Sequence, residues 1–456
     1  GSEMCIRDRR VAADQDRLKF HLMPKTGWLN DPNGLCQFNG TYHIYYQYTP
    51  FEPTGELKTW GHYTTKDFIH YEDVGPVVFP DEDIDAHGVY SGSAFIEDDT
   101  IHYFYTGNLK YFDRDDYDYI NSGRGSNTIT FTSKDGYEFT KKELLMTTDD
   151  YPADMSNHVR DPKIFKKNEK YYMVLGARDV EGVGMILLYE STDLKNWTYK
   201  NRITTPQKFG YMWECPDMFK IEGQQVLSVS PQGLKHEEYR FQNVYQSGYF
   251  LLKDGKMDVK EFQEWDMGFD FYAPQTFEDA KGRRILIGWM GLPDVEGEYM
   301  NPTAEKEGWQ HCLTVPREIR LYNGRLYQYP VEELKVLRGR DFRIDETQEN
   351  IEVFRPFELE MKLDTRMCRI SFGTDLILEA DGPKVWLRLY KEAGAGRRQR
   401  NAILPSGSLK ELRMLVDTTA VEIYLNHGET VFSTRYYPEK MSQTVKLEAE
   451  KFQGYI

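Results

Sequence analysis

Cysteine is scarce in this sequence, and its spacing points to no bonded framework. The 456 residues include five cysteines, and no two of them form a Cys-x-x-Cys pair. Neither a disulfide framework nor a cysteine zinc site is therefore indicated. The ten histidines likewise lack the spacing of metal ligands, such as His-Glu-x-x-His. The sequence predicts no metal and no cofactor.

Positive charge and long apolar runs are also lacking. The chain carries 57 Lys and Arg against 73 Asp and Glu, which gives a formal net charge of −16. This balance argues against a nucleic acid or an anionic membrane surface as the partner. No apolar run is long enough to span a bilayer, and no stretch has the composition of a signal peptide. We expect a cytoplasmic protein without a membrane or nucleic-acid partner.

The first residues lack a recognisable structural pattern. Gly1-Ser2 resembles a cloning scar, and the residues after it do not read as native secondary structure. We therefore expect residues 1–19 to be a tag or a non-native, disordered leader, and we exclude them from the fold.

Aromatic residues, by contrast, are abundant, with 32 Tyr, 25 Phe and 8 Trp. Such a composition is typical of β-structure, and aromatic faces also suit the apolar faces of sugar rings, although core packing explains most of them. Five β-rich apolar runs each follow a turn signal and recur about every 50 to 70 residues, the size of a four-stranded propeller blade. These runs are residues 41–46, 101–105, 171–175, 226–229 and 284–289.

A shorter repeat recurs three times inside the first. In each copy a Ser or Thr, a variable residue and an Asp precede an aromatic residue four positions after the Asp: Thr65-Lys66-Asp67 with Tyr71, Ser133-Lys134-Asp135 with Phe139, and Ser191-Thr192-Asp193 with Trp197. We interpret it as the hairpin that leads into the outer strand of a blade. The fourth and fifth blades lack it.

The pattern changes after the fifth blade. Residues 331–341 form a linker that begins with a helix-like stretch, and alternating apolar and polar residues follow at 351–354, 357–361, 385–389, 421–425 and 444–448. This alternation predicts an antiparallel sandwich. The basic cluster Arg397-Arg398-Gln399-Arg400 is interpreted as an exposed hairpin tip. The predicted fold is all-β: a five-bladed β-propeller over residues 20–330, a linker over 331–341 and a C-terminal β-sandwich over 342–456.

Three segments place a carboxylate one or two residues before a proline. They are Trp28-Leu29-Asn30-Asp31-Pro32-Asn33-Gly34, Arg160-Asp161-Pro162 and Trp213-Glu214-Cys215-Pro216-Asp217. Pro32 fixes its own φ and pushes Asp31 toward an extended conformation, so Asp31 should end a strand with its carboxylate projecting from a rigid bend. A plain surface turn would use the same residue types. Three such carboxylates in different blades instead indicate chemistry at an acetal carbon, where one acid and a second carboxylate are needed.

These segments resemble the Asn-Asp-Pro-Asn, Arg-Asp-Pro and Glu-Cys motifs of glycoside hydrolase family 32, which includes invertases, fructanases and sucrose-6-phosphate hydrolases. The similarity keeps the family's order from about Phe20 to the C-terminus and extends to residues 45–48, 60–62, 90–94, 270–275, 288–290 and 313–318. The resemblance implies the same five-bladed propeller and β-sandwich. It also implies a β-fructofuranosidase, most simply one that cleaves sucrose or sucrose 6-phosphate.

The resemblance also implies residue roles. Asp31 would be the nucleophile, Glu214 the acid/base, and Asp161 the group that binds two sugar hydroxyls in a retaining mechanism with a fructosyl-enzyme intermediate. Further candidates for binding the sugar are the polar residues Asn30, Gln47, Ser91 and Arg160 and the aromatic residues Trp60, Tyr90, Tyr272 and Trp289.

Several alternatives stay open at this point. The enzyme could act on fructans or fructooligosaccharides, or could transfer the fructosyl group to another sugar. A non-catalytic sugar-binding propeller is a different class, against which the intact carboxylate trio argues. The sandwich could brace the propeller or mediate homodimers. A preference for sucrose 6-phosphate would need cations at the pocket rim, for which Lys58, Lys110, Arg114 and Arg240 are the candidates.

Overall fold

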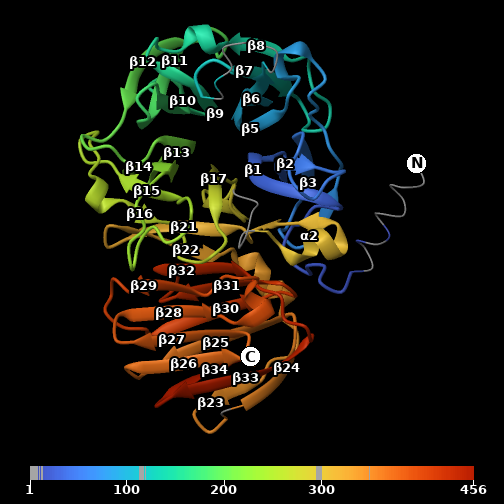
Figure 1. Cartoon of the computed structure of the whole chain (residues 1–456), viewed down its shortest axis with the longest axis vertical. Helices are drawn as coiled ribbons and strands as arrows, with labels where there is room; N and C mark the ends of the chain where they lie inside the picture. Colours follow the sequence, from blue (N-terminus) through green and yellow to red (C-terminus); the bar gives the residue numbers. More distant parts are fainter. Residues whose placement is uncertain are drawn as a thin grey trace.

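The computed structural model describes Arg9, Val11, residues 14–111, Asp118, residues 120–293, 300–348 and 350–456. Strands dominate, as Figure 1 shows, and helix is scarce. The chain forms the short helix α2 (Pro302–Glu307) and the 3₁₀ segments Asp83–Asp85, Thr148–Asp150, Val259–Glu261, Glu332–Leu337 and Lys391–Gly394. Glu332–Leu337 is the helix-like start of the predicted linker. Within the described residues, no helix has the length and apolar character needed to cross a membrane.

Five antiparallel sheets follow one another along the first part of the chain (Figure 1). The first contains β1 (Gly27–Phe38), β2 (Thr41–Thr49), β3 (Thr59–Thr65) and β4 (Tyr71–Asp73), with β19 (Trp309–Gln310) added in parallel to β1. The second contains β5 (Val89–Glu97), β6 (Thr100–Lys110), β7 (Arg124–Ser133) and β8 (Glu143–Met146). The third contains β9 (Met155–Lys167), β10 (Lys170–Asp179), β11 (Gly184–Ser191) and β12 (Thr198–Ile203).

The fourth and fifth sheets repeat this order. The fourth contains β13 (Met212–Ile221), β14 (Gln224–Gln232), β15 (Gly248–Leu251) and β16 (Gln263–Glu264). The fifth contains β17 (Tyr272–Glu278), β18 (Arg284–Met290), β21 (Arg317–Tyr322) and β22 (Arg325–Pro330), with β20 (Cys312–Leu313) paired to β18. The five apolar runs found in the sequence are the second strands of these sheets, β2, β6, β10, β14 and β18.

The first strands of the five sheets form a closed ring of contacts. β1 packs against β5, β5 against β9, β9 against β13, β13 against β17, and β17 returns to β1. β19, which follows the fifth sheet's first two strands in the chain, pairs with β1 through Gly27 and Trp28 and so ties the end of the ring to its start. Residues that project inward from these five strands therefore meet at one centre.

The three short sequence repeats form turns of the same geometry. The Oδ1 atoms of Asp67, Asp135 and Asp193 each accept hydrogen bonds from the backbone N–H groups two and three residues later, at 2.8–2.9 Å. The hydroxyl that precedes each Asp by two positions accepts from the N–H three residues after itself. These side chains satisfy the turn backbone after the third strand of each sheet, which explains why the spacing is kept.

The remainder of the chain forms two six-stranded antiparallel sheets (Figure 1). One has the order β23 (Arg343–Asp345), β34 (Phe452–Tyr455), β25 (Phe357–Leu363), β30 (Glu411–Val416), β31 (Ala420–Leu425) and β32 (Thr430–Arg435). The other has the order β24 (Asn350–Phe354), β33 (Ser442–Ala449), β26 (Met367–Phe372), β27 (Leu376–Asp381), β28 (Lys384–Leu389) and β29 (Gln399–Ile403). Alternate residues of both sheets bury into one shared apolar core, which includes Leu359, Ile370, Leu387 and Ile423.

Buried ion pairs join the two parts of the molecule. His21 lies between Asp417, at 2.9 Å, and Glu422, at 2.5 Å, and Glu422 also pairs with Arg317 of β21 at 2.6 Å. Burial disfavours a charged imidazole, but these two carboxylates outweigh it and raise the pKa of His21 to about 9. The junction between the ring of sheets and the two-layered part is therefore charged and dry.

The basic cluster near residue 400 differs from the sequence prediction, which was wrong for two of its members. Arg397 is 2% exposed and pairs with Asp270, while Arg400 is 8% exposed and donates to Asn243 Oδ1 at 2.7 Å. Only Arg398 of the three arginines faces solvent. The run is thus part of the junction, because buried carboxylate and amide partners from the earlier sheets replace the lost water.

Part of the segment that the sequence assigns to a leader contacts the folded chain. Asp417 accepts hydrogen bonds from the backbone N–H groups of Lys19 and Phe20, and Asp14 accepts one from the Trp309 indole at 2.7 Å. The division into a leader, residues 20–330, 331–341 and 342–456 stays a prediction. The described residues of the leader are ordered by these contacts.

Candidate active site

The ring of first strands carries an interruption at the same level in all five sheets. The pairing with the second strand skips two residues: Asn30–Asp31 in β1, Tyr90–Ser91 in β5, Asp161–Pro162 in β9, Cys215–Pro216 in β13 and Ala273–Pro274 in β17. In four of the five strands a proline lies within or directly after the gap, where it lacks the N–H needed for pairing. Each interruption is a β-bulge that re-aims the side chains beside it.

Three of these bulges contain a residue other than glycine in the left-handed backbone conformation. Asp161 has φ +68°, Cys215 has φ +47° and Ala273 has φ +50°. Non-glycine residues adopt this conformation at an energetic cost, and such residues concentrate at functional sites. The residues that line the central cavity come from these bulges: Pro32, Ser91, Gly92, Asp161, Pro162, Lys163, Cys215, Pro216, Ala273, Pro274 and Gln275.

Asp31 is held from two sides. The Ser91 hydroxyl donates to its Oδ2 at 2.6 Å, and the Asn30 amide donates to its Oδ1 at 3.2 Å. Asn30 is itself fixed by the Trp28 indole, which donates to its Oδ1 at 2.7 Å. Burial raises the pKa of Asp31, the Ser91 hydrogen bond opposes that rise, and the charge of Glu214 adds to it.

Asp161 and Asp31 share a neighbour in Cys215. The Cys215 backbone N–H donates to Asp161 Oδ2 at 3.0 Å, and its Sγ lies 3.4 Å from that oxygen and 3.6 Å from Asp31 Oδ2. Burial raises the pKa of Asp161, and the nearby charges of Glu214 and Asp31 raise it further against the opposing effect of Arg160. Burial and the same carboxylates also raise the pKa of the Cys215 thiol, so this cysteine is a neutral donor here.

Glu214 accepts hydrogen bonds from three side chains. Arg160 reaches its Oε2 through Nε at 3.0 Å and Nη2 at 2.9 Å. Gln232 and the Tyr272 hydroxyl donate to its Oε1 at 2.7 and 2.6 Å. Burial, followed by the charge of Glu214, raises the pKa of Tyr272 well above its usual range, so Tyr272 remains a donor. Glu214 is thereby oriented by three side chains through four contacts.

The other predicted site residues fall into two groups. Asn30, Ser91, Arg160 and Tyr272 contact one of the three carboxylates directly, as described above. Gln47 and Trp60 instead lie behind the site, where Gln47 donates to the Val89 carbonyl at 2.9 Å and the fully buried Trp60 donates to the Tyr90 carbonyl at 3.1 Å. Both fix the backbone of the β5 bulge, and a direct sugar contact for either stays a prediction.

Tyr90 and Trp289 have aromatic or cationic neighbours. The Arg124 guanidinium lies 5.1 Å from the Tyr90 ring centroid. Trp289 is 1% exposed and packs edge-on against Trp28, with ring centroids 5.9 Å apart. Its indole nitrogen has no hydrogen-bond partner among the residues that the structure describes. Trp289 therefore supports the aromatic wall behind Asn30 and Asp31.

Sequence reasoning missed Gln232 and the bridging position of Cys215. Gln232 lies at the end of β14, opposite Met212 rather than in any carboxylate motif, so no local signal marks it. Cys215 lay inside a recognised motif, and the following proline was the sign that its backbone N–H would leave the strand ladder.

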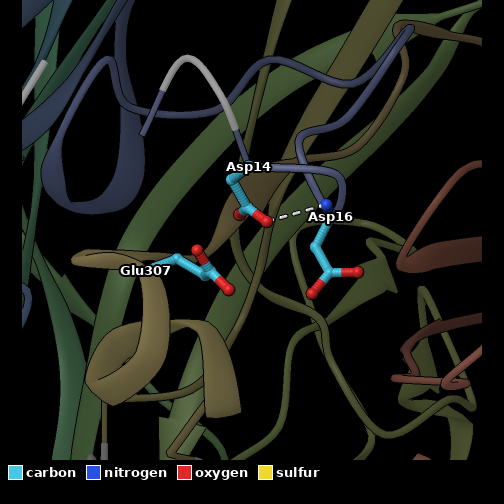
Figure 2. Close-up of side chains that lie close together, drawn as sticks. All are labelled: Asp14, Asp16 and Glu307. Atoms are coloured by element: carbon cyan, nitrogen blue, oxygen red, sulfur yellow. Dashed lines mark hydrogen bonds between the residues drawn. The ribbon is translucent and has the colours of Figure 1, made fainter. Parts of the chain in front are cut away.

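A separate group of acidic side chains lies near the start of the described chain (Figure 2). One ligand oxygen each of Asp14, Asp16 and Glu307 lies within 4.8 Å of the others. Asp14 accepts from the Asp16 backbone N–H at 2.8 Å, as the dashed line in Figure 2 shows, and also from Trp309. Acidic groups with such local partners do not by themselves define a cation site, and we assign none.

The fold and the three carboxylates are those of a glycosidase. Comparisons with known proteins identify the family. The family model described as "Glycosyl hydrolases family 32 N-terminal domain" matches residues 21–330, and "Glycosyl hydrolases family 32 C terminal" matches residues 391–454. The chain belongs to glycosyl hydrolase family 32.

Individual relatives agree with this assignment. The chain is 37% identical over 443 residues to "Sucrose-6-phosphate hydrolase" of Bacillus subtilis (strain 168), covering 93% of this chain and 90% of that protein. It is 37% identical over 441 residues to the protein of the same name from Salmonella typhimurium, covering 94% and 90%. The solved structure of sucrose-6-phosphate hydrolase from Lactobacillus gasseri matches with a TM-score of 0.88 and 28% identity, over 100% of this chain and 95% of that one.

Proposed function

We propose that this protein is a retaining β-fructofuranosidase that cleaves sucrose and sucrose 6-phosphate to release fructose. The observation that carries the proposal is the convergence of Asp31, Asp161 and Glu214 from three sheets around Cys215 and Arg160. Two carboxyl groups with separate hydrogen-bond environments are what glycoside hydrolysis requires. Family membership and the names of its relatives support the substrate class.

In the proposed first step Asp31 attacks the anomeric carbon of the fructosyl unit. The bond to the glucosyl oxygen breaks, and Glu214 gives that oxygen a proton, so glucose or glucose 6-phosphate leaves and fructose is held as an ester of Asp31. The short hydrogen bonds from Ser91 and Asn30 support this role, because they fix the attacking carboxylate in one orientation.

In the second step Glu214 takes a proton from water, whose oxygen bonds to the anomeric carbon; the bond from that carbon to Asp31 breaks, and fructose is released. The donors around Glu214 support this exchange of roles, because Arg160, Gln232 and Tyr272 stabilise its ionised form. Asp161 would bind two hydroxyls of the fructosyl ring. The hydrogen bond from the Cys215 N–H supports this role, because it fixes the Asp161 carboxylate in one orientation.

For the architecture we propose a five-bladed propeller followed by a β-sandwich. The closed ring of first strands and the shared core of the two six-stranded sheets support it. We propose the cytoplasm as the location, since sugar phosphates are formed and consumed inside cells.

The experiment compares release of fructose from sucrose, sucrose 6-phosphate and inulin by the parent protein and by Asp31→Asn. We expect both sucrose substrates to be cleaved, inulin to be a much poorer substrate, and Asp31→Asn to lose at least about 10³-fold in kcat while it melts at the parent temperature. Absence of fructose release from both sucrose substrates would refute the proposal. So would an Asp31→Asn variant within tenfold of the parent.

A further inference from the structure

Lys58 occupies an unusual position beside the active site. It lies just before β3, and its ammonium group sits 4.6 Å from the centroid of the Trp28 indole. Gly55 crosses the same ring, where an added Cβ would lie 2.6 Å from Trp28 Cε2 and 2.7 Å from Lys58 Nζ. Only glycine lets this loop close over the tryptophan. The loop therefore holds the ammonium in place rather than leaving it to move freely in solvent.

The Lys58 ammonium has no anionic partner at contact distance. No carboxylate in the described part of the chain forms an ion pair with it, and the charges that act on it are those of Asp31, Glu56 and Lys110. Burial lowers the pKa of Lys58 to about 7, and the neighbouring Lys110 lowers it further, against Asp31 and Glu56. A partly buried cation next to a second cation is unfavourable without an anionic ligand at contact distance.

The backbone places these two lysines on the rim between the first and second sheets. The Val89 N–H donates to the Lys58 carbonyl at 3.1 Å, directly before the Tyr90–Ser91 bulge. Lys110 ends β6, and its backbone N–H donates to the His87 ring at 3.0 Å. Lys58 thus lies between Trp28, three residues before Asp31, and Tyr90, one residue before Ser91.

Other cations near the site already have partners. Arg160 pairs with Glu214, and Arg124 donates to Asn108 Oδ1 at 2.8 Å while it lies over Tyr90. Arg240, a candidate from the sequence, donates to the Phe262 carbonyl and packs on Phe241, and a phosphate contact for it stays a prediction. Arg114 lies outside the described residues. Among the described residues, Lys58 and Lys110 have no ion-pair partner and are the cations that we assign to a ligand.

The direction of the leaving group connects this rim to the substrate. Ser91 and Cys215 contact Asp31 and, with Asp161, line the cavity at the centre of the ring. With the fructosyl unit seated against these residues, we infer that its glycosidic partner extends outward. The rim that this partner passes on the β1 and β5 side carries Trp28, Tyr90 and the Lys58 ammonium. Trp28 is covered by Gly55 and Lys58, whereas Tyr90 is half-buried and offers an aromatic side chain on which a sugar ring can stack. A charged substituent on that ring would reach the lysines.

We propose that Lys58, assisted by Lys110, binds the phosphate of the leaving glucosyl unit and makes the protein prefer sucrose 6-phosphate to sucrose. This inference rests on the proposed function. A phosphate dianion would supply the charge that both ammonium groups lack. Two charge-assisted contacts correspond to a preference of roughly 10²-fold or more in kcat/KM.

The test measures kcat/KM for sucrose and for sucrose 6-phosphate, at low and high salt, in the parent, Lys58→Met, Lys58→Arg and Lys110→Met. The quantity compared is the ratio of the two values, since any effect of Lys58 on Asp31 acts on both substrates and cancels. We expect Lys58→Met to lower the ratio at least tenfold, mainly through KM for the phosphorylated sugar. Lys58→Arg should retain most of the ratio, and Lys110→Met should lower it less.

The matched control is Lys66→Met, which removes one positive charge from the exposed outer turn of the same sheet. It should leave the ratio unchanged. Inorganic phosphate should compete with sucrose 6-phosphate in the parent and more weakly in Lys58→Met. A parent ratio near one at both salt concentrations would overturn the inference, as would a Lys58→Met variant that keeps the parent ratio. A parent that cleaves neither sugar would instead refute the proposed function.

Discussion

The ring of first strands and the two six-stranded sheets solve different problems with the same secondary structure. Every first strand of the ring breaks its pairing at one level, and three of the five breaks contain a left-handed residue that is not glycine. The strand pairs of the two six-stranded sheets keep an unbroken register, as in β27 with β26 and β28. Regular sheets bury apolar surface well, whereas an interrupted strand aims polar groups at a point.

The contrast extends to charge. In the ring, the half-buried Asp31 and the buried Asp161 lie near Glu214, and burial and the charge of Glu214 raise the pKa of both, with the charge of Asp31 adding to the rise at Asp161. At the junction with the six-stranded sheets, buried charges are matched instead, as in Arg317 with Glu422 and Arg397 with Asp270. Like charges kept together cost stability, and they persist where chemistry needs them.

The largest expected effect distinguishes the role of Glu214 from that of Asp161 by the need to protonate the leaving group. We expect Glu214→Gln to lower kcat/KM for sucrose by about 10²- to 10⁴-fold, and far less for an aryl fructoside, whose leaving group needs no proton. Asp161→Asn should lower kcat/KM for both substrates by the same factor, because Asp161 holds the fructosyl ring and not the leaving group. Steady-state kinetics with both substrates make this comparison. Equal leaving-group dependence in the two variants would show that their roles are assigned wrongly.

The next effect tests the matched charges at the junction. The folded pKa of His21 is raised to about 9 from an ordinary 6.5, so its stabilisation is complete below pH 6.5 and is lost as pH rises through 9. The shift corresponds to a contribution on the order of 3 kcal/mol at low pH. We expect His21→Gln to lower the melting temperature most at pH 6 and least at pH 9.5.

The control for this titration is His70→Gln, the same change at an exposed turn beside Asp67. It should produce no comparable pH-dependent difference in melting temperature. If the deficit of His21→Gln were constant from pH 6 to 9.5, the charged imidazole would not stabilise the junction.

The smallest effect compares the two kinds of strand directly. Ala273 lies at φ +50° in the β17 bulge, and Ala380 lies in the regular β27; both are buried, at 1% and 4% exposure. Replacing each by glycine removes the same methyl group. We expect Ala380→Gly to destabilise the protein by about 1 kcal/mol, and Ala273→Gly to be nearly neutral because glycine tolerates a positive φ. Urea denaturation measures both, and equal losses would show that the bulge stores no strain.

The sequence predicts much of the ring because its signals are local. The five apolar runs, the three Asp-containing turns and the prolines beside Asp31, Asp161 and Glu214 all lie within short segments. The bulge of β5 contains no carboxylate and no proline, so no local sequence signal predicts it. It is recognised only from its alignment with the bulges of the neighbouring strands in the structure. Arg397 was expected at the surface because its partner, Asp270, lies 127 positions earlier in the chain. Contacts of that range have no local signature.

The proposed mechanism requires that Asp31 forms a covalent bond to the fructosyl unit. The most direct measurement mixes Glu214→Gln with an aryl fructoside, quenches the reaction within milliseconds to seconds, and locates any adduct by mass spectrometry of the digested protein. Without the general base, the second step is slow and the ester accumulates. We expect a mass increase of one fructosyl unit on the peptide that contains Asp31. An adduct on the peptide that contains Asp161, or product release with no adduct at any time, would contradict this mechanism.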